Sequence, residues 1–210
     1  KILKENILVV GQGRLDAGVH AISQSAHFDV KNKIVNLKKF INRLNFLLNK
    51  SLISILDIKK KNRKFHSRYS AKVRIYKYII FNRNSVPIIN KNRGWHIKRN
   101  IDLKNLKEGA KFLVGKKDFS TFRASSCSAK SPIRTLEKIN IVKKSNQISI
   151  EFRSKSFLQT QVRSMVGSLK YLGEGKWNLK KFKKVTLSKK RELCAPPAPP
   201  HGLFLRKVIY

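Results

Sequence analysis

The feature that most constrains the fold is a long amphipathic segment at residues 155–172. Apolar side chains recur in it every three or four residues, as expected for a helix with one apolar face. These side chains are Leu158, Val162, Met165, Val166, Leu169 and Leu172. Gly173 follows as the expected helix stop. A face this wide has to pack against another apolar surface, and the neighbouring strand-like segments are the candidates.

Segments typical of strands occur on both sides of this helix. We predict strands at 6–10, 20–30, 52–58 and about 70–81, a hairpin over 133–153 with the turn KKSNQ, and a last strand in GLFLRKVIY. Further helices are predicted at 37–49, at 102–114 with Asp102 as N-cap and Gly115 as its end, and at 179–191. The order predicts an α+β architecture with two related sheet-and-helix units that meet at a cleft.

The boundary between the two units is expected in the basic stretch near residues 60–67. This gives an N-terminal α+β unit at 1–66 and a C-terminal α+β unit at 67–210. The segment APPAPP precedes the last strand. It is compatible with a polyproline ligand, but a bend that leads into a sheet strand is the favoured interpretation.

The charge of the chain points to a polyanionic partner. Its 210 residues hold 48 Lys and Arg against 11 Asp and Glu, a formal net charge of +37. Such a chain is expected to bind nucleic acid. The abundance of Lys, Asn and Ile also fits compositional drift, so binding to RNA at low salt would by itself establish little.

The thiols and imidazoles of the chain are scattered. Cys127 and Cys194 have no companions at metal-ligand spacing, and the five histidines are equally dispersed. We therefore expect no zinc site and a reducing, cytoplasmic location. No run of about 18 apolar residues is present, so no membrane span is expected. No signal peptide is recognisable, and the sequence begins with Lys1 rather than Met.

The stretch VVGQGRLDAGVHA at residues 9–21 contains Gly-x-Gly after an apolar run. A dinucleotide-binding loop needs a third glycine where Asp16 stands, and a carboxylate there would repel a pyrophosphate. Small neighbours instead allow a planar group to approach Asp16. The alternative for an aspartate in this position is that it only forms a turn.

Two other side chains acquire meaning only together with Asp16. Arg163 lies at the edge of the apolar face of the 155–172 helix, where it either extends to solvent or pairs with a carboxylate and keeps it ionised. Tyr76 lies on the long predicted strand, where it is either a sheet residue or a ring on which a flipped base stacks.

Five segments in order resemble the TruA-type tRNA pseudouridine synthases. GRLDAGVHA resembles the family's GRTDAGVHA box, and the likeness continues in FHSRYSAKVRIYKYIIFN, DFSTFRASSCSAKSPIRTL, FLQTQVRSMVGSLKYLGEGKW and the closing AP-x-HGLFL. The resemblance implies the pseudouridine synthase fold, with a basic central cleft, in a homodimer. It also implies isomerisation of uridine at positions 38–40 of the tRNA anticodon stem-loop, without metal or organic cofactor.

The resemblance assigns roles to individual residues. Asp16 matches the catalytic aspartate, Tyr76 the tyrosine that packs against the target base, and Arg163 the arginine paired with the aspartate. Arg14 in the same box is expected to flip or hold the target. The candidate substrate-binding residues in the matching segments are Arg14, Arg68, Arg74, Tyr76 and Arg123.

The chain departs from the family pattern in three places. Leu15 replaces the threonine before the aspartate, and Gln159-Thr160-Gln161 replaces the family's His-His-Met. The family's first forty-odd residues, with a Tyr-Asp-Gly and a Gly-Trp-Gln stretch, have no counterpart. The first two departures are expected to alter rate or tRNA preference. The third is expected to leave a sheet edge exposed and part of the RNA cleft absent. The departures also keep open a rival interpretation, a non-catalytic tRNA-binding protein of the same fold.

Overall fold

The computed structural model describes residues 2–210, and these form two compact units. One unit comprises the residues up to Gly13 together with Ser25–Ser70. The other comprises Arg14–Gln24 and Ala71–Tyr210. This differs from the predicted division at residues 66 and 67 in two segments. Residues 67–70 belong to the first unit, and residues 14–24, which carry Asp16, pack with the C-terminal part of the chain.

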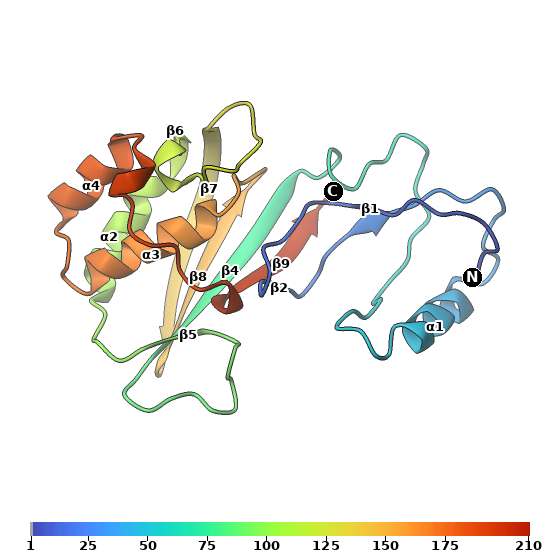
Figure 1. Ribbon diagram of the computed structural model, residues 1–210, viewed down its shortest axis with the longest axis horizontal. Coiled ribbons are helices and arrows are strands. Elements are labelled where there is room, and N and C mark those ends of the chain that lie inside the picture. The colour runs from blue at the N-terminus through green and yellow to red at the C-terminus, as the bar shows by residue number, and fades with distance from the viewer. Residues whose placement is uncertain (1) are drawn as a thin grey trace. The chain divides into compact units, whose positions relative to one another are not determined.

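The larger unit is built on a seven-stranded mixed sheet. Its strands lie in the order β2-β9-β4-β8-β7-β6, and β5 pairs in parallel with β4 (Figure 1). The strands are β2 (His20–Ala21), β4 (Val73–Asn82), β5 (Trp95–Ile97), β6 (Gly115–Asp118), β7 (Ile133–Lys144), β8 (Gln147–Ser154) and β9 (Leu203–Ile209). The predicted long strand, hairpin and final strand are therefore confirmed as β4, β7–β8 and β9.

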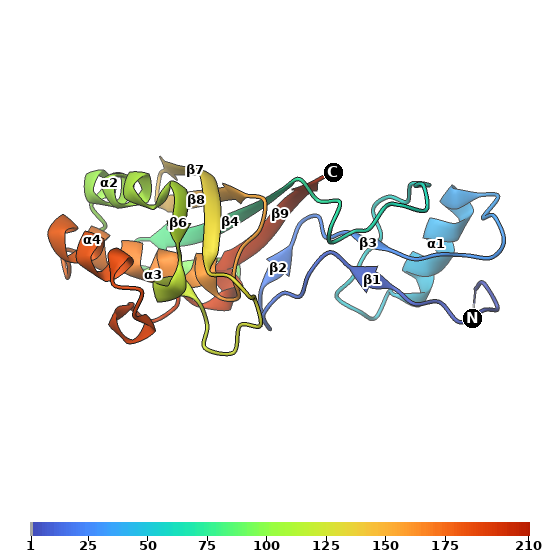
Figure 2. The same ribbon diagram turned by 90° about the horizontal axis from the view of Figure 1, so that it is seen from above.

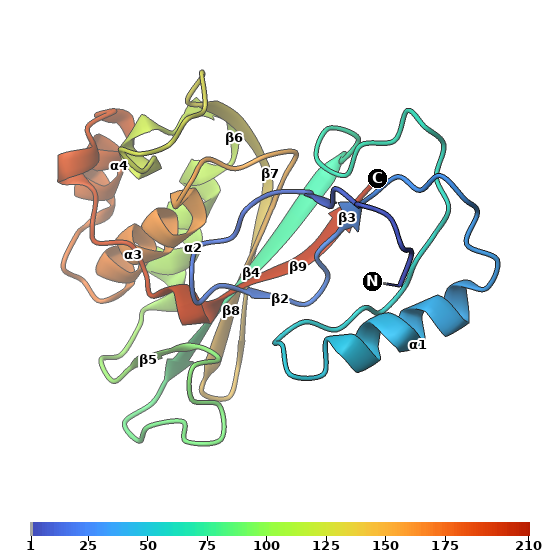
Figure 3. The ribbon, with the colours of Figure 1, turned by 45° about the vertical axis from the view of Figure 1, so that its right-hand side comes forward.

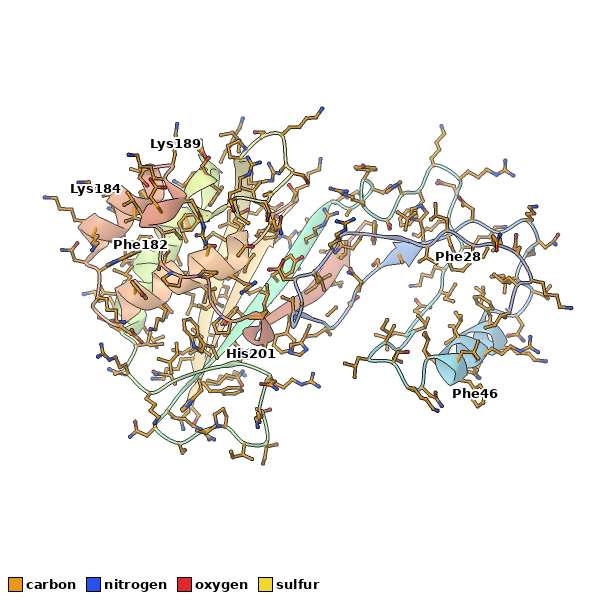
Figure 4. All side chains as sticks on the ribbon, viewed as in Figure 1. Phe28, Phe46, Phe182, Lys184, Lys189 and His201 are labelled. Carbon is orange, nitrogen blue, oxygen red and sulfur yellow. The ribbon has the colours of Figure 1, made fainter. Side chains whose placement is uncertain are left out.

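Three helices cover one face of this sheet, as the view from above shows (Figure 2). They are α2 (Leu103–Leu113), α3 (Gln161–Gly173) and α4 (Leu179–Leu187). Alternate strand residues such as Tyr78 and Ile150 are fully buried beneath them, together with Met165 of α3 and Phe182 of α4. Phe182 is labelled among the helices in Figure 4. The apolar face of the sheet, which repeats every two residues, and the apolar faces of the helices, which repeat every 3.6 residues, thus pack together in one core.

Local sequence signals mark the start and the end of α2 where they were predicted. The Asp102 carboxylate accepts hydrogen bonds from the backbone N–H groups of Lys104 and Asn105, at 2.7 and 3.2 Å, which confirms it as the N-cap of α2. Gly115 follows α2 with φ +107°, a conformation that favours glycine. Both features were visible in the sequence because a cap acts within one helical turn.

The start of α3 was predicted wrongly. The helix begins at Gln161, six residues later than the 155–172 pattern indicates. Leu158 is buried in the core without being helical, and its backbone N–H is bonded to the Gln161 side chain at 2.8 Å. Thr160 then has φ +63°, in the left-handed region, so the chain turns sharply before the helix starts. Apolar spacing alone cannot distinguish this entry loop from helix.

The smaller unit has little regular structure. It contains α1 (Leu37–Leu47), as predicted, and the short strands β1 (Val10–Gly11) and β3 (Ala26–His27), which pair with each other. The predicted buried strand at 6–10 is wrong apart from its last residue, because Leu8 and Val9 are exposed. The predicted strand at 52–58 is absent from the described chain, and Leu52 is fully exposed. Phe46 of α1, labelled in Figure 4, is also largely exposed.

The predicted extended segment at 20–30 is divided between the units. Its first residues form β2, which pairs in parallel with β9 in the larger unit, whereas Ala26–His27 form β3 in the smaller one. Short 3₁₀ turns at Ser120–Phe122 (η1), Arg191–Leu193 (η2) and Pro200–Gly202 (η3) complete the larger unit. APPAPP is thus the bend that leads through η3 into β9. Within residues 2–210, no helix is long and apolar enough to cross a membrane.

Candidate active site

Asp16 lies in a tight turn that leads directly into β2. The Val19 N–H donates to the Asp16 carbonyl at 3.0 Å, and Gly18, inside the turn, has φ +80°. This left-handed backbone conformation favours glycine, because a residue with a side chain would be strained in it. Gly18 also packs against the Pro200 ring. The turn therefore holds Asp16 at the edge of the sheet, close to the start of β9.

Arg163 lies in the first turn of α3 and reaches the aspartate. Its Nη1 donates to Asp16 Oδ2 at 2.7 Å, although 147 positions separate the two residues. Both side chains are mostly shielded from solvent, which makes a charge-assisted hydrogen bond stronger than it would be at an open surface. The structure therefore confirms that Arg163 pairs with a carboxylate and does not extend into solvent.

A backbone segment fixes the other part of the guanidinium. Arg163 Nε donates to the Ala198 carbonyl at 2.7 Å, and the Ala198 N–H donates to the Arg163 carbonyl at 2.9 Å. Because Nε and Nη1 are engaged at once, the plane of the guanidinium has a fixed direction. The proline-rich loop thus aims the arginine, a contribution that sequence reasoning missed because a backbone carbonyl has no residue-type signal.

Tyr76 of β4 lies within electrostatic reach of the ion pair. Burial raises the pKa of its phenol to about 12, the positive charge of Arg74 opposes this shift, and the negative charge of Asp16 adds to it. The ring packs edge-on against Phe157, with centroids 5.2 Å apart. A phenol in this setting stays protonated at neutral pH, so it can serve as a flat, neutral packing surface or a hydrogen-bond donor.

We expect the Tyr76→Phe variant to keep the shape of the pH–rate profile between about pH 6 and pH 9. The phenol is not ionised in this range, because its raised pKa lies well above it. Removing the ring in Tyr76→Leu should lower kcat/KM by about 10- to 100-fold, the range for loss of one stacked base. Single-turnover rates over this pH range test both expectations. A titrating limb that disappears in Tyr76→Phe would contradict them.

The other predicted binding residues are placed differently. Arg14 is exposed two residues before Asp16. Arg74 donates to the Lys155 carbonyl at 2.6 Å, and Arg123 donates to the carbonyls of Cys127 and Ala129, so these two side chains hold neighbouring loops. Arg68 belongs to the smaller unit, where its guanidinium lies over the Tyr69 ring.

Two histidines that sequence reasoning passed over as scattered also flank the site. His20, four residues after Asp16, stacks on Phe204 with ring centroids 4.8 Å apart. His201 lies in η3, three residues after Ala198, and is labelled in Figure 4. Burial and the proximity of His20 lower the pKa of His201. No spacing rule links the two positions, because β2 and β9 come together only in the folded sheet.

Comparison with known proteins shows which family the chain belongs to. A family model described as tRNA pseudouridine synthase matches residues 110–210, which include α3 and Arg163. Among curated proteins, the tRNA pseudouridine synthase A of Pelagibacter ubique (strain HTCC1062) is 62% identical over 210 residues. That of Neorickettsia sennetsu (strain ATCC VR-367 / Miyayama) is 40% identical over 209 residues. Each alignment covers 100% of this chain and 85% of the relative.

A third relative, the tRNA pseudouridine synthase A of Anaplasma marginale (strain Florida), is 38% identical over 213 residues, with the same coverage of both chains. Identity of this extent over the whole chain shows the family. The chain belongs to the TruA-type tRNA pseudouridine synthases, the isomerases of uridine in tRNA, as the motifs predicted.

Proposed function

We propose that this chain converts uridine to pseudouridine at positions 38 to 40 of the tRNA anticodon stem-loop. The observation that carries the proposal is the 2.7 Å bond between Asp16 and Arg163 in a chain of this family. A carboxylate aimed by a fixed cation beside a partly buried aromatic ring is the arrangement that the reaction requires. No metal or organic cofactor enters the proposed chemistry.

Asp16 acts on the sugar of the target nucleotide. Arg163 binds Oδ2, and we assign the attack to Oδ1. In one route Oδ1 attacks C1′ and the C1′–N1 bonding pair leaves with uracil. The base turns, C5 displaces the carboxylate from C1′, the C5 proton is lost, and N1 gains a proton. In the other route the carboxylate removes the C2′ proton, and a C1′=C2′ double bond forms as uracil leaves with the C1′–N1 pair. When C5 then bonds to C1′, C2′ regains its proton, the C5 proton is lost and N1 gains a proton. Either route divides one difficult step into easier ones.

Arg163 and Tyr76 keep the reacting groups in place. Arg163 orients the Asp16 carboxylate through the 2.7 Å charge-assisted hydrogen bond to Oδ2, which leaves Oδ1 for the sugar. Tyr76 packs against the detached uracil and limits its escape, so that recapture at C5 stays effectively intramolecular. The shielding of the ion pair from solvent supports this assignment, because water would compete with the returning base.

The arginines near the site supply the RNA contacts. Arg14, which is exposed beside the catalytic turn, is proposed to hold the flipped nucleotide. Arg74 and Arg123 are proposed to attract phosphates while they brace their loops. Arg68, on the smaller unit, is proposed to contact a more distant part of the tRNA. Such contacts offset the cost of unstacking, a few kcal/mol.

We further propose that the enzyme is a homodimer and works in the cytoplasm. The free thiols of Cys127 and Cys194 fit a reducing compartment. Light scattering at several protein concentrations would measure the oligomeric state.

The function is tested by mapping pseudouridine in tRNA transcripts that differ only in where uridine stands. One set carries a single anticodon-arm uridine at 38, 39 or 40, and the control transcript carries none of the three. We expect product only in the first set, at a salt concentration that suppresses non-specific binding. Product in the control would overturn the assignment of positions. Tight binding without any product would favour the non-catalytic tRNA-binding protein.

A further inference from the structure

We propose that residues 83–94, here called the arm, form an aliphatic wedge that enters the tRNA helix beside the target uridine and holds the opened stack. The arm connects β4 to β5 and is the green loop between them in Figures 1 and 3. It belongs to the same compact unit as Asp16, Tyr76 and Arg163. The inference rests on the proposed function and adds a device for opening the substrate.

The tip of the arm presents apolar side chains to solvent. Val86, Ile88 and Ile89 are 51%, 71% and 98% exposed, whereas Pro87 between them is buried. Large aliphatic side chains exposed together call for a partner. Pro87 anchors the tip, so its neighbours project outward.

The charge around the tip selects the partner. Residues 83–101 contain five Lys or Arg and no acidic residue. A second copy of this loop would bring like charges together, whereas an RNA backbone would neutralise them. Isoleucine cannot read a base edge by hydrogen bonding, but aliphatic side chains are used as wedges between base steps. An apolar tip surrounded in sequence by five Lys or Arg residues therefore fits a nucleic-acid helix better than a protein surface.

Hydrogen bonds within the arm stiffen it. Arg83 donates from Nε to the Ser85 carbonyl and from Nη2 to the Val86 carbonyl, each at 2.9 Å. Beyond the tip, the Asn90 N–H donates to the Pro87 carbonyl at 3.1 Å, and the Arg93 N–H donates to the Asn90 carbonyl at 3.0 Å. A wedge has to resist the restacking of bases, and a loop with fixed turns does so at lower entropic cost than a loose one.

The two histidines attach the base of the arm to the catalytic machinery. His20 Nε2 is bonded to the Asn92 carbonyl at 2.9 Å, and His201 makes a hydrogen bond with the backbone of Gly94. Gly94 itself packs so closely on Phe81 that a Cβ would lie 2.5 Å from that ring. Because His20 follows the Asp16 turn and His201 follows the Ala198 anchor of Arg163, one frame holds both the arm and the ion pair.

The test compares two tRNA substrates that differ in one base. In the first the target uridine is paired, and in the second its partner is changed so that no pair forms. We expect the double variant Ile88→Ser, Ile89→Ser to lose about tenfold or more in kcat/KM on the paired substrate. On the unpaired substrate the loss in kcat/KM should stay within about threefold, because a mismatched base costs less free energy to unpair and unstack. Leu187→Ser, at a 65% exposed position of α4, is the matched control and should behave as the parent.

A second measurement is independent of turnover. In Asp16→Asn protein, 2-aminopurine beside the target uridine should brighten on binding as the stack opens, and the double serine variant should abolish most of that rise. Equal losses on both substrates, no loss on either, or an unchanged fluorescence rise would each overturn the wedge. A change in oligomeric state caused by the serines would overturn it in favour of a contact between copies. If the parent makes no product at all, the proposed function fails, and fluorescence still decides the wedge.

Discussion

Replacing Asp16 by Asn is expected to reduce pseudouridine formation by about four orders of magnitude or more, the range seen when a catalytic nucleophile is removed. Asparagine has nearly the same shape, and its carbonyl oxygen can still accept the hydrogen bond from Arg163 Nη1. The turn that holds residue 16 depends on the backbone and on Gly18, so it should persist. The variant therefore removes the charge and the nucleophilicity while it leaves the packing intact.

The measurement is single-turnover product formation with excess protein, together with tRNA affinity at about 0.2 M salt, where non-specific phosphate contacts are weakened. Affinity should change by less than about threefold. Asp57→Asn serves as control, because Asp57 is an exposed carboxylate paired with Lys59, and its loss should leave the rate unchanged. A rate within tenfold of the parent in Asp16→Asn would show that another group attacks the sugar.

Elements that depend on neighbouring residues were predictable from the sequence. The N-cap at Asp102 and the β7–β8 hairpin each follow from residues close together in the sequence. The helix α3 ends at Gly173 as predicted, but the left-handed glycine behind it is Gly175. The 6–10 and 52–58 segments failed because a strand needs a partner, and pairing is a property of distant residues. Val10 and Gly11 pair with His27 and Ala26, whereas Leu8 and Val9 before them have no strand partner in the described chain and are exposed.

The candidate site was predictable only in part. Asp16, Tyr76 and Arg163 were identified through a family resemblance, since no spacing rule joins residues 147 positions apart. The structure adds the reason they meet: β2 pairs with β9, which also pairs with β4, and the loop before β9 binds Arg163. The Ala198 carbonyl, His20 and His201 escaped notice because backbone groups and scattered histidines acquire partners only in the folded chain.

The loop that aims Arg163 depends on the absence of a side chain at residue 167. A Cβ built on Gly167 would lie 2.0 Å from the Pro196 carbonyl oxygen and 3.2 Å from its carbonyl carbon. The obstacle is backbone, so it cannot rotate aside as a flexible side chain would. Gly167→Ala should therefore lower the free energy of unfolding by about 3 kcal/mol, at the upper end of the overpacking range. The thermal midpoint should fall by about 6 to 12 °C.

The same substitution should also impair catalysis in the molecules that remain folded. To accommodate the methyl group, residues 196–198 have to move away from α3. The hydrogen bond from Arg163 Nε to the Ala198 carbonyl is then lost. The guanidinium loses one of its two fixed directions, and the carboxylate of Asp16 is aimed less well. Melting followed by circular dichroism measures the stability, and single-turnover rates about 15 °C below the midpoint of the variant measure the chemistry. Gly11→Ala, outside the GRLDAGVHA box, is the matched control, since a Cβ there would meet only the Gly13 carbonyl oxygen, at 4.0 Å. A normal rate at that temperature, despite a lowered midpoint, would show that the proline-rich loop supports the fold without aiming the arginine.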